Sequence, residues 1–354
     1  MSSFEPAEPL RLLVGCYTPP RGDGAGVRLI VHDHAAQTLT VGGLTPTPSP
    51  SALAVSLDGT TVFAVSEDGP GAVSSFAWRP SGVLEHLTTQ PSEGADPCQL
   101  LVDETGEFLF AANYSGSCIA ARPVSTSGEL GPACDVRAFT GHGPDEDRQA
   151  VAHPHQVVQR PGHSELVVAD LGADRLHRLT FDRPSGRFGP ELPPVVLPAG
   201  TGPRQVAFTA DGLGAFVLGE LSSTLVLFDW SAEPPQLIEI VPCFPDGTPS
   251  GNLAAGLVLE GARLFASQRG ADQVTVFAVA DGPLSAGSLT VLDPINARGR
   301  WPRHIAVVDD WLYVANERSD TVVAVRLHDT DGVADVLSVE VPSPTFVLPL
   351  DRSD

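Results

Sequence analysis

Short apolar runs alternate with polar turns along the whole chain, and one phrase of this kind recurs. Its clearest copy, residues 152–170 (AHPHQVVQRPGHSELVVAD), contains His-Pro-His, an apolar run, a turn and a second apolar run that ends on an acid. Residues 202–220 (GPRQVAFTADGLGAFVLGE) and 301–317 (WPRHIAVVDDWLYVANE) repeat it closely. Short apolar runs separated by turn residues are typical of β-strands, so the pattern predicts pairs of strands at these places.

Related units fill the rest of the chain, with a period of about fifty residues and four short strands in each. They begin near residues 10, 51, 97, 153, 203, 252 and 302. In the second unit the turn Asp58-Gly59 separates two strands, which predicts a hairpin. A blade cannot bury both of its faces alone, and stacking around a ring solves this. We therefore predict an all-β fold: a seven-bladed β-propeller of four-stranded antiparallel blades, with residues 1–354 as a single domain.

Two further segments complete this picture. The apolar segment 343–350 (SPTFVLPL) is expected to close the ring by joining a blade shared with the N-terminal segment. The longest insertion, residues 140–155 (TGHGPDEDRQAVAHPH), is rich in Gly, Pro and acids and is interpreted as a loop within the domain.

Composition narrows the possible partners. The 35 Gly and 33 Pro residues are interpreted as turn residues, because they follow no period. A net charge of −22 argues against nucleic acid or an anionic membrane as a partner, but allows a small anionic ligand at a local arginine cluster. The 5 cysteines are widely spaced without a CxxC motif, which indicates neither a disulfide framework nor a zinc site. No apolar run approaches membrane-spanning length, and a cytoplasmic location is expected.

The repeated phrase predicts where polar side chains gather. In an antiparallel hairpin, the start of the first strand and the end of the second lie at the same edge, and in a propeller the first strand lines the central channel. Polar residues at both places should therefore converge at one mouth of that channel. The first-strand starts carry Cys98, His153, His155, Arg204, Gln205, Arg303 and His304. The second-strand ends carry Tyr17, Glu67, Asn113, Asp170, Glu220, Arg269 and Glu317.

Each of these residues also has a purely structural interpretation. An Arg and a Glu on neighbouring blades can pair to hold the ring closed, and the histidines can cap strand ends. Asn113 and Asp170 can be turn residues that bond the backbone. His153 and His155 could be two metal ligands, but no carboxylate-plus-His set completes a metal pattern, so neither a metal nor another cofactor is expected. Three arginines at equivalent places in an acidic protein favour an anionic ligand.

Several phrases of the chain resemble those of a known family. The most specific of them are AANYSGS (111–117), DRQAVAHPHQV (147–157), VADLGADRL (168–176), GPRQVAF (202–208), LGELSSTLVLF (218–228) and SQRGADQVTVF (267–277). They resemble the seven-bladed propeller lactonases, which include propeller-type 6-phosphogluconolactonases and carboxy-cis,cis-muconate cyclases. The resemblance runs from residue 12 almost to the end of the chain.

The resemblance implies a set of site residues. Those expected to be catalytic are His155 (or His153), Arg204, Glu220 and Arg269. Beyond what the resemblance implies, we expect further residues of the mouth and of the adjoining loop to bind substrate: Asn113, Arg148, Gln149, His153, Asp170, Arg303, His304 and Glu317. The chain departs from the family pattern at Gln205, where His is frequent, and at Gly219, where Asn is frequent.

Three functions are consistent with such a site. The first is hydrolysis of a sugar-acid lactone, most simply 6-phosphogluconolactone. His155 is favoured over Glu220 as the base because arginines would lower the pKa of a carboxylate. Arg204 or Arg269 would stabilise the oxyanion, while Arg303, with Arg148 as a further candidate, would bind a phosphate or carboxylate. The second function is the reverse reaction type, in which a lactonising cyclase closes a muconate-type dicarboxylate into a lactone.

The third function is a non-enzymatic binding propeller. It would need apolar anchors on one face, and only Tyr114 and Trp301 flank the proposed mouth. The expected partner is thus a small anionic lactone or carboxylate, and the protein is expected to be a monomer or a weak homo-oligomer.

Overall fold

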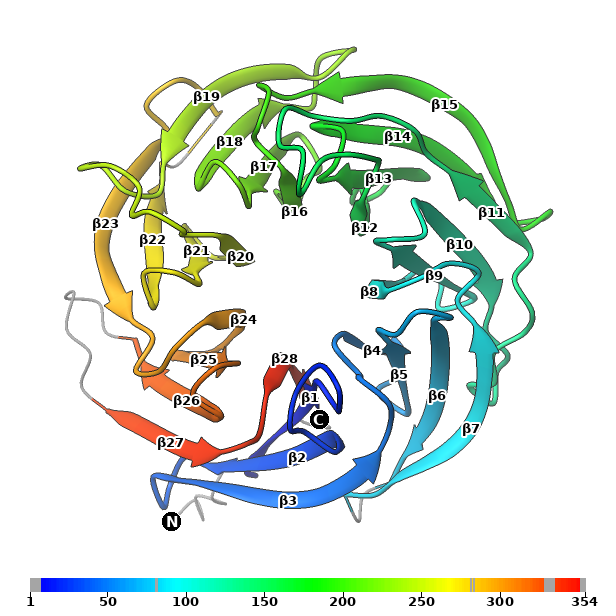
Figure 1. The fold of residues 1–354 in the computed structure, drawn as a ribbon, viewed down its shortest axis with the longest axis vertical. Helices are drawn as coiled ribbons and strands as arrows, with labels where there is room; N and C mark the ends of the chain where they lie inside the picture. Colours follow the sequence, from blue (N-terminus) through cyan, green and yellow to red (C-terminus); the bar gives the residue numbers. More distant parts are fainter. Residues whose placement is uncertain (1–7, 80–81, 281, 283, 328–334, 351–354) are drawn as a thin grey trace, which may run out of the picture.

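Seven four-stranded antiparallel sheets stand side by side in a ring, which confirms the predicted seven-bladed β-propeller (Figure 1). The computed structural model describes residues 8–79, 82–280, 282, 284–327 and 335–350. We number the blades along the chain. Blade 1 is β28-β1-β2-β3, and blades 2 to 7 are β4–β7, β8–β11, β12–β15, β16–β19, β20–β23 and β24–β27.

The four strands of each blade lie one after another, from the centre of the ring to its rim. The innermost strands are β28 (Pro344–Leu350), β4 (Leu53–Val55), β8 (Pro97–Val102), β12 (Pro154–Gln159), β16 (Pro203–Phe208), β20 (Ala254–Glu260) and β24 (Pro302–Val308). The second strands are β1 (Leu10–Cys16), β5 (Thr61–Ser66), β9 (Phe108–Asn113), β13 (Glu165–Asp170), β17 (Gly214–Gly219), β21 (Arg263–Gln268) and β25 (Trp311–Asn316).

The outer half of each blade contains the remaining strands. The third strands are β2 (Gly26–Asp33), β6 (Ala72–Trp78), β10 (Cys118–Pro123), β14 (Arg175–Asp182), β18 (Thr224–Asp229), β22 (Gln273–Val279) and β26 (Thr321–Arg326). The outermost strands are β3 (Thr38–Pro46), β7 (Leu84–Pro91), β11 (Asp135–Ala138), β15 (Arg187–Val196), β19 (Gln236–Pro242), β23 (Leu289–Asn296) and β27 (Val336–Glu340).

The burial pattern explains why the ring forms. The second strand β13 (ELVVAD) is buried at every position, whereas the outermost strand β27 (VLSVE) alternates between exposed and half-buried residues. Seven apolar clusters are present in the described residues, and each one lies between two neighbouring blades. The hydrophobic core is therefore distributed around the ring, and every blade needs both neighbours to bury its two faces.

Strand β28 closes the ring, as predicted from the C-terminal apolar segment. It pairs antiparallel with β1 and places Leu348 opposite Leu13, so the two ends of the chain build one blade. The insertion before the fourth unit is a loop up to residue 153: residues 139–153 join β11 to β12 without regular strands, whereas Pro154 and His155, predicted as part of the loop, begin β12.

The contact between blades 1 and 2 leaves no room for a side chain at Gly15. A Cβ atom added there would lie 1.9 Å from the carbonyl oxygen of Pro50. We expect Gly15→Ala to lower the free energy of unfolding by about 1–3 kcal/mol, because one of the two backbones must move. Gly43→Ala is the matched control, since its Cβ would meet only Gly82 O at 3.5 Å. Denaturant unfolding of both variants tests this, and equal stability would contradict it.

Candidate active site

One backbone hydrogen bond recurs in all seven blades and defines the mouth of the channel. In each blade, the residue after the second strand donates its backbone N–H to a carbonyl near the start of the innermost strand. The accepting residue precedes that strand or the short segment that leads into it. Glu220 donates in this way to Gly202 (2.8 Å), and Glu317 to Trp301 (3.1 Å). The residues that donate this bond, here called the end ring, are Tyr17, Glu67, Tyr114, Leu171, Glu220, Arg269 and Glu317. The residue two positions after each accepting residue belongs to a second set, here called the inner ring. Its members are Ser51, Cys98, His155, Arg204, Ala255, Arg303 and Thr345.

The structure does not bring Asn113 and Asp170 to this mouth, although the sequence predicted it. Both lie one residue before the end ring, so their side chains point into the blade. Asn113 Nδ2 donates to Ser92 O at 2.9 Å, and Asp170 Oδ1 accepts from His153 N at 2.7 Å. These are the turn-stabilising roles of the alternative interpretation. The end-ring positions of these two blades are Tyr114 and Leu171.

Two other expected substrate-binding residues also bond within the protein. Gln149 is fully buried, and its Nε2 donates to Leu171 O at 2.8 Å, which anchors the 139–153 loop. The ring of His153 stacks on Tyr114, with centroids 4.2 Å apart, and its Nδ1 lies 2.9 Å from Tyr114 O. Gln149 therefore holds the loop, and His153 positions the tyrosine.

Glu220 is the centre of the most highly charged cluster at the mouth. Its carboxylate is fully buried and contacts Arg148 at 2.5 Å, Arg204 at 2.5 Å and Arg269 at 2.9 Å. These arginines come from the 139–153 loop, the inner ring and the end ring of the next blade. Three guanidinium groups against one carboxylate give the cluster a net charge of +2. Such a site stabilises an additional negative charge.

The pKa values follow from this arrangement. Burial alone would raise the pKa of Glu220, but Arg269, Arg204 and Arg148 together hold it well below its usual range. Burial lowers the pKa of Arg269 to about 10, against the raising effect of Glu220. Glu220 is therefore a permanent anion that holds three cations in place.

A second charged cluster lies across the channel. On blade 7 it repeats the pairing of an inner-ring arginine with an end-ring glutamate. Arg303 of the inner ring contacts Glu317 at 3.3 Å and donates to the Tyr17 hydroxyl, which in turn donates to Glu67 at 2.9 Å. Arg21, on the loop between β1 and β2, binds Glu67 at 2.8 Å and also reaches Asp96. Here carboxylates outnumber arginines, so the charge of Arg303 is already neutralised.

A small axial cavity of about 20 Å³ lies between the two clusters, with room for roughly one water molecule. Its lining includes His155, Arg204, Arg303 and His304. His304 Nδ1 accepts from Val347 N at 3.3 Å and its ring stacks on Phe346, and burial lowers its pKa to about 3. His304 is therefore neutral and tied to β28.

His155 differs from His304, because its buried Nδ1 has no hydrogen-bond partner among the described residues. Burial, followed by the charge of Arg204, holds the pKa of His155 well below its usual range. A neutral imidazole that lines the cavity beside Arg204 and Arg303 can accept a proton.

The two departures from the family pattern also have local explanations. Gln205 lines the cavity and accepts from Leu257 N at 2.5 Å, so its amide bridges blades 5 and 6. A Cβ at Gly219 would lie 2.4 Å from Ser222 Oγ and 2.8 Å from Thr201 O, so this position faces the blade packing and leaves no space for a larger residue.

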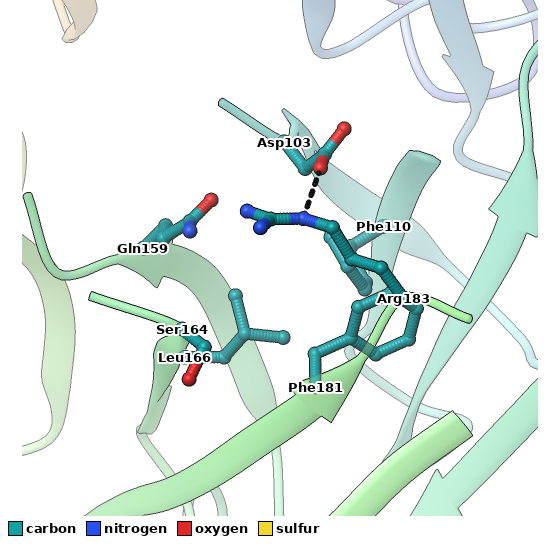
Figure 2. A pocket seen from close by; sticks show the side chains of 7 residues that line it. All are labelled: Asp103, Phe110, Gln159, Ser164, Leu166, Phe181 and Arg183. Atoms are coloured by element: carbon teal, nitrogen blue, oxygen red, sulfur yellow. Dashed lines mark hydrogen bonds and ion pairs between the residues drawn. The ribbon is translucent and has the colours of Figure 1, made fainter. Parts of the chain in front are cut away.

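A second hollow in the described part of the chain lacks such a cluster. It is a cleft between blades 3 and 4, at the opposite end of the innermost strands, and its volume is about 10 Å³. Figure 2 shows the side chains that line it. In it Arg183 Nε donates to Asp103 Oδ2 at 3.1 Å, so the ion pair already satisfies the charged groups (Figure 2). No group of three or more His, Cys, Asp or Glu side chains that could hold a metal ion occurs in the described part of the chain. Nor does any helix of these residues have the length and apolarity needed to cross a membrane.

Sequence reasoning missed Arg21, which no repeat or strand pattern indicates because it stands in a loop. It named Tyr17 and Glu67 as mouth residues, and the structure brings them together there, but their mutual hydrogen bond was not expected. The four residues expected to be catalytic, His155, Arg204, Glu220 and Arg269, do converge.

Comparison with known proteins gives a consistent result. Residues 11–349 match the family described as "Lactonase, 7-bladed beta-propeller". The 6-phosphogluconolactonase of Bacillus subtilis (strain 168) is 27% identical over 94% of this chain and 96% of its own length.

Two solved structures share the fold closely. The periplasmic gluconolactonase of Pseudomonas aeruginosa has a TM-score of 0.88 and 28% identity, over 97% of this chain and 99% of that one. A protein from Lactobacillus plantarum has a TM-score of 0.88 and 27% identity, over 97% and 100% of the two chains.

Proposed function

The chain belongs to the seven-bladed β-propeller lactonase family, and on that premise we propose that it opens a sugar-acid lactone, with 6-phosphogluconolactone as the first substrate to test. The observation that carries the proposal is the cluster of Arg148, Arg204 and Arg269 around the buried Glu220, next to the neutral His155. Lactone opening places negative charge on the carbonyl oxygen, and this cluster has the surplus positive charge to stabilise it.

The proposed reaction begins with a water molecule beside His155. As the water oxygen attacks the lactone carbonyl carbon, His155 takes one of its protons, and negative charge develops on the carbonyl oxygen. Arg204 and Arg269 face that oxyanion. When the intermediate collapses, the ring C–O bond breaks, and the proton on His155 passes to the released alkoxide. The product is the open hydroxy acid, and its carboxyl group then ionises.

His155 suits the role of base better than Glu220 does. Both oxygens of Glu220 are bonded to arginines, and its pKa is well below the usual range, so it has little affinity for another proton. The low pKa of His155 makes it a weak base but keeps it in the unprotonated form that the reaction needs.

The two arginines that face the oxyanion are held rigidly. Arg204 Nε donates to Ala255 O at 3.1 Å, and Arg269 Nη2 donates to Ala254 O at 3.2 Å, so β20 fixes both guanidinium groups. Donors fixed in advance require no reorganisation as charge develops, which is the condition for efficient electrostatic catalysis.

The pKa of His155 predicts an unusual pH profile. Because its folded-state pKa lies below 6.5, the base stays unprotonated when pH falls through 6.5, and kcat/KM should remain level there. Activity should decline only at still lower pH, as His155 takes up a proton. Initial rates between pH 8 and 4.5, corrected for spontaneous opening, test this. A half-maximal point near pH 6.5 would contradict it.

A substrate panel tests the proposed activity. The assay measures turnover of three compounds: freshly generated 6-phosphogluconolactone, unphosphorylated gluconolactone and a muconate-type dicarboxylate. The rate of spontaneous opening is subtracted for each lactone. We expect opening of a sugar-acid lactone well above background. Turnover of the dicarboxylate alone would replace the proposal with a lactonising cyclase, and no turnover of any of the three would overturn it.

A further inference from the structure

Two exposed arginines at the edge of the mouth have no acidic partner. Arg300 and Arg318 lie in the turns that enter and leave β24 and β25, and neither forms an ion pair with any residue that the structure describes. Arg300 Nη2 donates only to Arg318 O, at 2.9 Å. In a chain with a net charge of −22, two adjacent unpaired arginines form an unusual positive patch.

Trp301 connects this patch to the candidate active site. The guanidinium carbon of Arg318 lies 3.4 Å from the centre of the Trp301 ring, and that of Arg269 lies 5.5 Å from the same centre. Arg269 in turn contacts Glu220 at 2.9 Å. One indole ring therefore separates the unpaired arginine from the cluster proposed to stabilise the oxyanion.

The backbone conformation of Trp301 is unfavourable for such a large residue. Its φ is 65°, in the left-handed region. The same blade position has φ of 36° at Ser49, 52° at Asp96, 59° at Gly202 and 46° at Ser343. Five of the seven blades thus share this conformation, and the four besides blade 7 meet it with small, polar or glycine residues, whereas His153 and Leu253, at the same position of blades 4 and 6, have no positive φ. A tryptophan here is explained by what its ring supports.

Hydrogen bonds hold the patch in one arrangement. Trp301 N donates to Asp272 Oδ1 at 2.7 Å, Arg318 N donates to Arg300 O at 3.1 Å, and Arg300 N donates to Ser319 Oγ at 2.8 Å. The two turns are therefore bonded to each other and to blade 6. A site fixed in advance loses less conformational freedom when it binds a ligand.

The arginines first expected to bind a phosphate are less suitable. Arg303 is paired with Glu317 at 3.3 Å, and Arg148 with Glu220 at 2.5 Å. A phosphate would have to compete with those carboxylates, whereas Arg300 and Arg318 have no carboxylate partner among the described residues, and a guanidinium group suits phosphate oxygens.

We propose that Arg300 and Arg318, with Arg318 supported on Trp301, bind a phosphate monoester at the end of the substrate remote from the lactone carbonyl. The proposal rests on the proposed lactone-opening activity and names the class of substrate that this mouth selects.

Paired substrates test the subsite. We expect Arg318→Ala to raise KM for 6-phosphogluconolactone about tenfold or more, the loss expected for a charge-assisted hydrogen bond, and to leave kcat/KM for unphosphorylated gluconolactone unchanged. Trp301→Ser, which copies Ser49 and Ser343, should fold normally and raise KM for 6-phosphogluconolactone more than it lowers kcat/KM for gluconolactone, because the ring also lies against Arg269. Arg263→Ala, at the far end of β21, removes an equal charge away from the mouth and should affect neither substrate.

The outcomes separate this proposal from the proposed function. An equal loss toward both lactones, or no loss toward the phosphorylated one, overturns the subsite and leaves the lactonase intact. If wild-type protein opens neither lactone, the proposed activity fails, and calorimetric binding of inorganic phosphate decides the subsite alone. Binding to wild type that is lost in Arg318→Ala supports it. Absence of binding, or binding unchanged in Arg318→Ala, overturns it.

Discussion

Replacing Arg269 by alanine is expected to lower kcat for lactone opening by about a hundredfold or more, the loss typical of a missing oxyanion donor. Arg269 is buried, it is fixed by β20, and Glu220 joins it to Arg204, which lines the cavity together with His155. KM should change less, because this interaction forms mainly in the transition state. Arg269→Lys should recover only part of the loss, since an ammonium cannot donate to both Glu220 and the oxyanion with the planar geometry of a guanidinium.

The control for this experiment lies on the same strand. Arg263→Ala removes an arginine from the opposite end of β21 and should leave kcat unchanged. Glu220 keeps Arg148 and Arg204 when Arg269 is removed, so the variant should still fold. Unchanged turnover in a folded Arg269→Ala protein would remove Arg269 from the mechanism.

The second large effect is expected on stability. In Glu220→Ala, two buried arginines, Arg204 and Arg269, lose the only carboxylate partner that they have among the described residues. Breaking such a buried arrangement from one side costs about 3–5 kcal/mol, because uncompensated charge remains in the interior. Glu220→Gln keeps the shape and one acceptor oxygen, and should be intermediate. We expect the melting temperature of the alanine variant to fall by about 5–10 °C.

Blade 7 provides the matched control. Glu317 occupies the same end-ring position and pairs with the inner-ring Arg303, but it is partly exposed, and Arg303 keeps Tyr17 as a partner. Glu317→Ala should therefore cost less than Glu220→Ala, because Arg303 keeps Tyr17 and Glu67 as partners. If thermal unfolding shows the two alanine variants to be equally stable, Glu220 does not organise the site in the way described.

The repeat made most of the fold predictable. The recurring Pro-polar starts and acidic ends indicated seven blades, and the apolar C-terminal segment indicated the closing strand β28. The same repeat predicted that Arg204, Glu220 and Arg269 meet, because equivalent positions of neighbouring blades lie side by side.

Register was the limit of this reasoning. Asn113 and Asp170 are the last residues of their strands, whereas Glu220 is the first residue after β17. This difference of one residue decides whether a side chain faces the channel or the blade. The sequence also could not show which arginines remain unpaired. The neutralisation of Arg303 depends on Tyr17 and Glu67, which are far from it in sequence and arrive through ring closure.

The two aromatic residues near the mouth bear on the alternative of a protein-binding propeller. Tyr114 stacks on His153, and Trp301 stacks against Arg318. Both rings thus already contact side chains of the protein itself, where a hot-spot anchor would need a free apolar face.

The most direct measurement compares wild type and His155→Gln in the opening of freshly generated 6-phosphogluconolactone at pH 7, with the spontaneous rate subtracted. The side chain of glutamine fills the site without accepting a proton. We predict a wild-type rate well above background and a variant rate close to background, while both proteins unfold at similar temperatures. A variant as fast as wild type would contradict the account of how this mouth works.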